Sequence, residues 1–251
     1  MRLALLPRFG STLPSFLRFS SSTSRTPAVV ADGLDRIPHL SSARGVLRGL
    51  DWAGTAVFAA SGSIAAAECG FDLLGAVAVG TVTAVGGGTL RDIVIFTRPP
   101  FWSGAAPDGG EPEYLLLAFF SAAAAFLCVP LLGVPNDDAA DAVALGAFAV
   151  IGAMNGARAG LPMLQSILCG VVTGTGGGTI RDVWLRRPVR IFHSHKELYA
   201  TCAATGAFSF LSAPRAWSFA VRVALGVGST AAMRAVSIAA PLKLPTWEAL
   251  S

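Results

Sequence analysis

Seven long apolar stretches, separated by short polar segments, dominate the chain from about residue 50 onward. A transmembrane helix needs about 20 mainly apolar residues, and most of these stretches approach or reach that length. The pattern predicts spans at residues 50–67, 73–96, 114–134, 142–157, 161–185, 198–213 and 217–240. The sequence therefore indicates an all-α membrane protein of about seven transmembrane helices, with the lipid bilayer as its first partner.

Composition agrees with the apolar pattern. Of the 251 residues, 53% are hydrophobic and 14% are charged, whereas soluble proteins average roughly a quarter charged. The net charge of +4 comes from basic residues scattered between the apolar stretches and at the N-terminus. Because they form no basic face with interleaved aromatics, we expect no nucleic-acid partner.

The chain contains the same unit twice. A glycine triplet followed by Thr, an aliphatic residue, Arg and Asp occupies residues 86–92 and recurs at residues 176–182, 90 positions later. The same offset joins further identical pairs, including Asp51 with Asp141, Phe58 with Phe148, Gly62 with Gly152 and Thr83 with Thr173. Such self-similarity at a fixed period predicts a duplicated structural unit.

Each copy holds three predicted spans, and this odd number predicts that the second copy enters the membrane from the opposite side. The fold class that follows is two inverted three-helix repeats plus a seventh helix. The expected divisions are a transit peptide (1–31), a linker (32–49), a first membrane repeat (50–135), a second membrane repeat (136–213) and the seventh helix with its tail (214–246).

The two triplets are the first candidates for a transport route. Glycine is costly inside a membrane helix, so we expect the second and fifth spans to be broken there, with free carbonyls and amides facing a solute. The alternative is that the glycines let two helices approach closely. The candidate pathway residues are Gly86, Gly87, Gly88, Thr89, Gly176, Gly177, Gly178 and Thr179.

Charged residues follow each triplet. Neighbouring residues on a helix point about 100° apart, so Arg91 and Arg181 are expected to pair with a carboxylate of the other copy rather than with Asp92 and Asp182 beside them. The first span of each copy opens with an acid, Asp51 or Asp141. These acids are expected to stabilise the helix start, and they are also candidate partners in this charge network.

Catalytic and metal chemistry have little support in the sequence. The three histidines, His39, His193 and His195, lie outside the spans, so Thr89 and Thr179 have no base nearby. The cysteines Cys69, Cys128, Cys169 and Cys202 show no metal-binding spacing and are expected to be apolar side chains. We expect neither an enzyme nor a cofactor.

Residues 1–31 carry four arginines and many serines and threonines, and the first acidic residue is Asp32. Transit peptides are rich in Arg and Ser and poor in acids. The segment therefore predicts targeting to a mitochondrial or chloroplast membrane. The alternative is an ordinary tail on a plasma-membrane protein.

The chain resembles the glycine-transporter-domain family of small bacterial membrane proteins across about residues 50–246. The resemblance lies in the doubled motif and in the segments Asp51–Gly62, Asp141–Gly152, Lys196–Ala200, Arg234 and Leu242–Pro245. That family is distantly similar in fold to trimeric intracellular cation channels. The resemblance implies a route within each protomer and a homotrimer.

Three functions follow from these patterns. The first is transport of a small solute, glycine by the family's name, along the triplet-bearing helices. The second is a channel for a monovalent cation such as potassium. The third is a membrane scaffold that transports nothing, which would have an occluded interior without polar lining beside the triplets.

Overall fold

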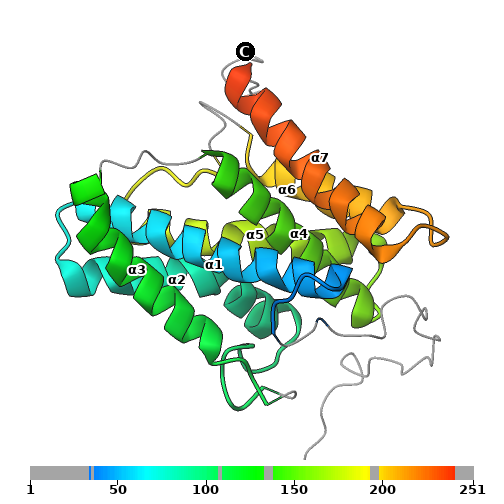
Figure 1. Ribbon diagram of the computed structural model, residues 1–251, viewed down its shortest axis with the longest axis horizontal. Coiled ribbons are helices and arrows are strands. Elements are labelled where there is room, and N and C mark those ends of the chain that lie inside the picture. Colours follow the sequence, from blue (N-terminus) through cyan, green and yellow to red (C-terminus); the bar gives the residue numbers. More distant parts are fainter. Residues whose placement is uncertain (1–33, 35–36, 107–108, 133–137, 193–197, 241–251) are drawn as a thin grey trace, which may run out of the picture.

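The computed structural model describes residues 34, 37–106, 109–132, 138–192 and 198–240, with the side chains of 131, 132, 138 and 139 left out. Seven α-helices and one π-helix account for most of this part of the chain (Figure 1). They are α1 (Ala43–Glu68), α2 (Leu73–Leu90), η2 (Arg91–Ile95), α3 (Glu113–Leu132), α4 (Asp138–Arg158), α5 (Met163–Trp184), α6 (Ala200–Ser212) and α7 (Phe219–Ala239).

Polar side chains fix the start of three of these helices. Ser42, Asp72 and Ser218 each accept a hydrogen bond from a backbone N–H three residues later, as N-caps do. The cap at Ser42 starts α1 at Ala43, well before the predicted start at residue 50 and inside the predicted linker. The first two turns carry Arg44 and Arg48, which lower their hydropathy and hid them from the apolar pattern.

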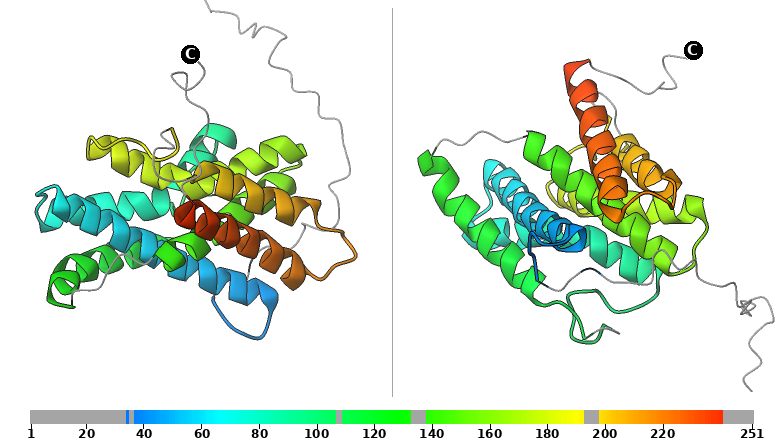
Figure 2. Two further views of the ribbon diagram at one scale, coloured as in Figure 1. Left: turned by 90° about the horizontal axis from the view of Figure 1, so that it is seen from above. Right: turned by 45° about the vertical axis from the view of Figure 1, so that its right-hand side comes forward.

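The two repeats have the same internal contacts. In the first, α1 contacts α2 and α3; in the second, α4 contacts α5 and α6. Between the repeats α1 contacts α4 and α2 contacts α5, while α7 lies beside α4 and α6 (Figures 1 and 2). The predicted architecture of two inverted three-helix repeats plus a seventh helix is therefore confirmed.

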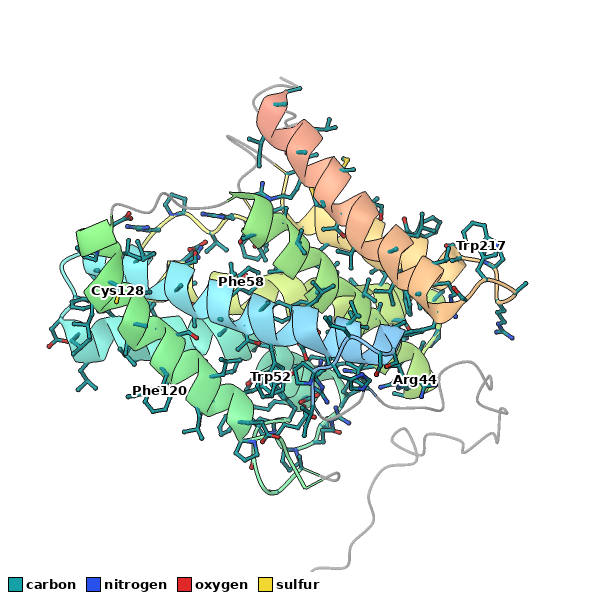
Figure 3. All side chains as sticks on the ribbon, in the orientation of Figure 1. Arg44, Trp52, Phe58, Phe120, Cys128 and Trp217 are labelled. Carbon is teal, nitrogen blue, oxygen red and sulfur yellow. The ribbon has the colours of Figure 1, made fainter. Side chains whose placement is uncertain are left out.

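Within the described residues, four helical segments are long and apolar enough to cross a bilayer, by length and composition. They are Leu73–Ile95, Glu113–Pro130, Ala140–Arg158 and Phe219–Ala239. Because α6 has only 13 residues, it is shorter than the roughly 20 that a membrane span needs. The outer face of α3 is apolar, and Figure 3 shows Phe120 pointing away from the bundle, as a lipid-facing side chain would.

The helices α2 and α5 are continuous through both triplets, so the breaks expected there are absent. The physical reason is a close helix crossing. A Cβ atom added at Gly87 would overlap the carbonyl oxygen of Thr173, and one added at Gly177 would overlap that of Thr83. The triplets therefore let two backbones touch, as small residues do in membrane helix pairs. Only the first triplet is followed by a change of helix type, at η2.

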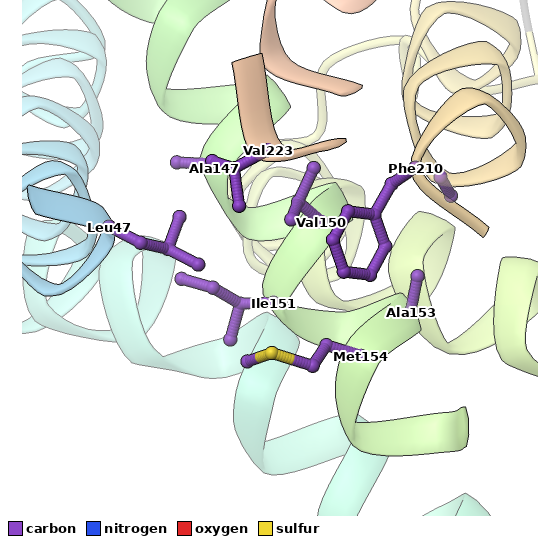
Figure 4. Close-up of a cluster of buried hydrophobic side chains, with 9 residues drawn as sticks. Leu47, Ala147, Val150, Ile151, Ala153, Met154, Phe210 and Val223 are labelled. Atoms are coloured by element: carbon purple, nitrogen blue, oxygen red, sulfur yellow. The ribbon is translucent and has the colours of Figure 1, made fainter. Parts of the chain in front are cut away.

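The seventh helix is attached through an apolar cluster around α4. Figure 4 shows Val150 and Met154 of α4 between Leu47 of α1, Phe210 of α6 and Val223 of α7. All five side chains are buried. The cluster joins three elements to α4, which contacts α1, α5, α6 and α7.

The helix crossing makes a stability prediction. We expect Gly87→Ala and Gly177→Ala to destabilise the protein by about 1–3 kcal/mol each, because the added methyl group must displace backbone rather than a side chain. Gly228, also inside a helix, is the matched control because nothing lies within 4 Å of its Cβ position. Gly228→Ala should be neutral or stabilise by up to ~1 kcal/mol. Thermal unfolding in detergent would measure all three, and equal melting temperatures would contradict the crossing.

Candidate functional site

A cavity of about 510 Å³, which we call the large cavity, lies mainly against the first repeat. It is beside the crossing and is lined by α1, α2, η2, the start of α3 and the residues before it, and by α4 and α5 of the second repeat. Its charged lining consists of Arg48, Asp51, Arg91, Arg98, Glu111 and Arg158. Asp51 lies more than two turns into α1, so it does not stabilise the helix start as predicted. It is still in the first half of α1, whereas Arg158 is at the end of α4, so equivalent helices of the two repeats run in opposite directions here.

A second cavity, which we call the small cavity, lies in the second repeat and holds only about 10 Å³. That volume is enough for about one water molecule. Its polar lining is Thr83, Asp141, Thr175, Thr179, Arg181, Asp182, Arg190 and Tyr199.

The two cavities occupy equivalent positions in the two repeats. Seven residues of the large cavity have a counterpart 90 positions away in the small cavity. The pairs are Asp51 with Asp141, Ala84 with Gly174, Gly88 with Gly178, Arg91 with Arg181, Phe101 with Ile191, Phe148 with Phe58, and Thr173 with Thr83. The duplication has therefore produced two related cavities, one roomy and one nearly filled.

A buried charge cluster closes one wall of the large cavity. Tyr114 donates a short hydrogen bond to Asp51 and accepts one of 2.8 Å from Arg48. Arg48 also donates a hydrogen bond of 3.1 Å to Oε2 of Glu111, and its guanidinium lies 3.5 Å from the carboxylate of Asp51. Buried charges are costly unless they are paired and hydrogen-bonded, and these are both.

The second repeat builds a related cluster with a different arginine. Tyr199 donates a hydrogen bond of 3.2 Å to Asp141, and Arg234 of α7 lies 3.5 Å from the same carboxylate. The guanidinium of Arg234 also lies 4.9 Å from the centre of the Tyr199 ring, a cation–π distance. The added helix thus supplies the cation that Arg48 supplies in the first repeat.

The arginine that follows each triplet pairs with its own neighbour. Arg91 donates two hydrogen bonds, of 3.0 and 2.9 Å, to Oδ1 of Asp92, and Arg181 donates two, of 2.9 and 2.7 Å, to Oδ1 of Asp182. The predicted pairing across the repeats is therefore wrong. The long arginine side chain can bend back along its own helix, and Asp51 and Asp141 are already bound by their tyrosines.

Asp92 organises more of the site than any other acid in the described residues. It is fully buried, and its Oδ1 also accepts two hydrogen bonds from Arg98, of 3.2 and 2.9 Å. Its Oδ2 accepts a hydrogen bond of 2.9 Å from the backbone N–H of Phe101. One carboxylate therefore holds two arginines and a loop in place at the large cavity.

Only part of the predicted pathway lines a cavity. Gly88 lines the large cavity, and Gly178 and Thr179 line the small one. Thr89 lines neither of the two, because its hydroxyl accepts a hydrogen bond of 2.9 Å from Trp102. The inner glycines lie in the helix crossing instead: Gly86, Gly87, Gly176 and Gly177.

Sequence reasoning missed several residues of the site. Tyr114 and Tyr199 lie near the ends of predicted spans, where an aromatic residue is typical of a membrane interface, yet both are buried and bind the paired acids. The spacing of Arg48 and Asp51, three apart on one helix face, is a signal that could have been found. Among the described residues, no three His, Cys, Asp or Glu side chains are placed to hold a metal ion.

Comparison with known proteins agrees with the duplication. A family model described as "Glycine transporter" matches residues 48–130 and again residues 138–215, one match per repeat. The chain belongs to the glycine transporter family. The inner membrane protein YadS of Escherichia coli is 35% identical over 206 residues, covering 79% of this chain and 94% of YadS. A membrane protein of Vibrio cholerae is 34% identical over 202 residues, covering 79% of this chain and 81% of its own.

Solved structures show the same fold for this glycine transporter family member. A TRIC cation channel has a TM-score of 0.67 at 28% identity, covering 79% of this chain and 96% of the channel. A TRIC trimeric intracellular cation channel orthologue from Rhodobacter sphaeroides has a TM-score of 0.66 at 32% identity, covering 78% and 99%. The family and fold that the sequence resembled are thereby confirmed.

The role of Asp92 can be tested by removing its charge. We expect Asp92→Asn to destabilise the protein by about 3–5 kcal/mol, because Arg91 would lose its buried counter-charge. Glu68→Gln is the matched control, since Glu68 is exposed and pairs with the exposed Arg187. That change should cost no more than about 1 kcal/mol. Thermal unfolding in detergent measures both, and an unchanged melting temperature for Asp92→Asn would contradict the assignment.

Proposed function

We propose that the protein carries a small zwitterion such as glycine across the membrane, by way of the two cavities beside the α2–α5 crossing. The observation that carries the proposal is the presence of both signs of charge in the lining of the large cavity. A zwitterion must meet a carboxylate for its ammonium group and a cation for its carboxylate group. The large cavity offers both beside a polar wall.

Both signs of charge lie on the walls of the large cavity. Asp51 and Glu111 supply carboxylates beside Arg48 on the side of α1 and α3, while Arg91 and Arg98, which share Asp92, supply guanidinium groups on the side of η2. Guanidinium groups bind carboxylates with planar, paired hydrogen bonds. The volume of about 510 Å³ also lies in the range typical of ligand pockets.

A monovalent cation channel is the second candidate, favoured by the structural likeness to TRIC cation channels. Two observations speak for the zwitterion instead. The continuous helices leave no broken segment whose free carbonyls could replace a hydration shell. The lining of the large cavity has four arginines against two carboxylates, and this excess of positive charge would repel a passing cation.

The scaffold alternative has less support. It predicts an occluded interior without polar lining beside the triplets. The large cavity instead reaches Gly88 and carries six charged side chains. Intramembrane charge is expensive, and it usually faces a substrate or ion pathway.

Assembly and location complete the proposal. We propose a homotrimer, in keeping with the trimeric TRIC orthologue, with a complete route in each protomer. The chain is an integral membrane protein, and we propose an organellar membrane because residues 1–31 have the composition of a transit peptide. Those residues lie outside the described part of the chain. YadS is named as a bacterial inner membrane protein, so the plasma membrane is the alternative.

Reconstitution tests the proposed transport. We expect liposomes with the purified protein to take up labelled glycine, and Asp51→Asn to slow uptake about tenfold or more by removing a charge-assisted contact to the ammonium group. Glu68→Gln should leave uptake unchanged, because Glu68 lines neither of the two cavities. Potassium current without glycine uptake would contradict the carrier and favour the channel. The absence of both would contradict both.

Targeting can be tested without reconstitution. We expect residues 1–31 fused to a fluorescent protein to direct it into mitochondria or chloroplasts, because the segment is basic and free of acids. Replacing Arg2, Arg8, Arg18 and Arg25 by Gln should abolish import. Microscopy in plant or animal cells reads the result, and diffuse fluorescence of the unaltered fusion would contradict an organellar location.

A further inference from the structure

Two phenylalanine rings stand between the large and the small cavity. Phe148 of α4 lines the large cavity and Phe58 of α1 lines the small one. Their ring centroids are 5.0 Å apart with the planes tilted by 55°, a favourable aromatic contact. Each ring is only 6% exposed, and Figure 3 shows Phe58 inside the bundle. They are also equivalent residues of the two repeats, so the pair lies where the repeats meet.

The cavities are separate in this structure. No described residue lines both of them. The helix crossing closes the other side of the partition, because the α2 and α5 backbones touch at Gly87 and Gly177. A solute moving from the large cavity to the small one must therefore pass the two rings.

The small cavity is filled by a difference between the repeats. Thr55 lines the large cavity, but its counterpart 90 positions later is Leu145, which is fully buried. The Leu145 side chain lies 3.0 Å from the Cβ position of Gly174, a residue that lines the small cavity. The structure is thus open on the side of the first repeat and closed on the other.

We propose that the Phe58–Phe148 pair is the constriction of the transport route and sets the largest solute that can cross. The inference rests on the proposed function, and it names the residues that govern selectivity by size. Each ring lies against a small residue of the other repeat. A Cβ at Gly54 would be 3.3 Å from the Phe148 ring, and Ala144, the counterpart of Gly54, belongs to the same buried cluster as Phe58.

In this proposal the constriction opens when one ring turns away from the other. An apolar constriction excludes water and ions while the rings are in contact, which is how hydrophobic gates work. Turning one ring would join the two cavities without moving the α2–α5 crossing. The charged clusters at Asp51 and Asp141 would then lie on the same continuous path, one on each side of the rings.

The test uses thiol labelling, which needs no knowledge of the solute. In the full chain with its four cysteines replaced by Ala, Thr175→Cys places a thiol in the small cavity and Asn155→Cys places one in the large cavity. A membrane-impermeant sulfonate-bearing methanethiosulfonate is added from the large-cavity side. With both rings intact, Asn155→Cys should react and Thr175→Cys should not. After Phe58→Ala and Phe148→Ala, the labelling rate of Thr175→Cys should rise about tenfold or more.

Phe210→Ala is the matched control for loss of a buried ring. Phe210 is 3% exposed and lines neither of the two cavities. The Phe210→Ala substitution should leave the thiol of Thr175→Cys unreactive toward the methanethiosulfonate. The constriction would be overturned by labelling of Thr175→Cys with both rings intact, by no labelling after both are removed, or by equal labelling in the Phe210→Ala protein.

Solute uptake then separates this inference from the proposed function. Phe148→Ala should admit a larger zwitterion such as leucine, which the unaltered protein should exclude relative to glycine. Uptake of both solutes at the same ratio before and after the change would overturn the size limit. If the unaltered protein takes up no zwitterion at all, the proposed function fails, while the labelling result still decides whether the rings divide the two cavities.

Discussion

Close contact between the α2 and α5 backbones is the constraint on which the rest of this structure depends. In a bilayer the hydrophobic effect does not drive helices together, so association rests on packing and on polar contacts. The triplets remove the side chains that would keep the two helices apart, at Gly86, Gly87, Gly176 and Gly177. The contact fixes the relative position of the two repeats, and hence of everything that each repeat carries.

The polar parts of the protein are arranged around this contact. Each helix leaves the crossing toward an arginine and an aspartate that pair with one another, and each repeat adds a tyrosine bound to an acid of its first helix, Asp51 or Asp141. The duplication therefore makes two similar cavities on opposite sides of the same crossing. Their difference in volume comes from local substitutions such as Leu145 in place of Thr55, and from the loop that Asp92 holds.

Much of the fold could be predicted from sequence, because span length and the 90-residue offset are direct readings of the chain. The role of the triplets could not be predicted from the sequence. A broken helix and a close crossing both need glycine, and only the residues opposite, here Thr83 and Thr173, decide between them. The predicted partners of the arginines were wrong for a similar reason. The direction in which a side chain leaves the helix does not show how far a long, flexible arginine can bend back to its neighbour. The tyrosines were missed because an aromatic residue near a helix end also suits a membrane interface.

An experimental structure of the protein in a lipid nanodisc, at a resolution that shows the backbone carbonyls, is the most direct test of this account. The account predicts that α2 and α5 remain helical through their triplets and touch at Gly87 and Gly177, with the charged cavities on either side of the contact. Helices that unwind at the triplets and enclose a central pore lined by glycine carbonyls would contradict it.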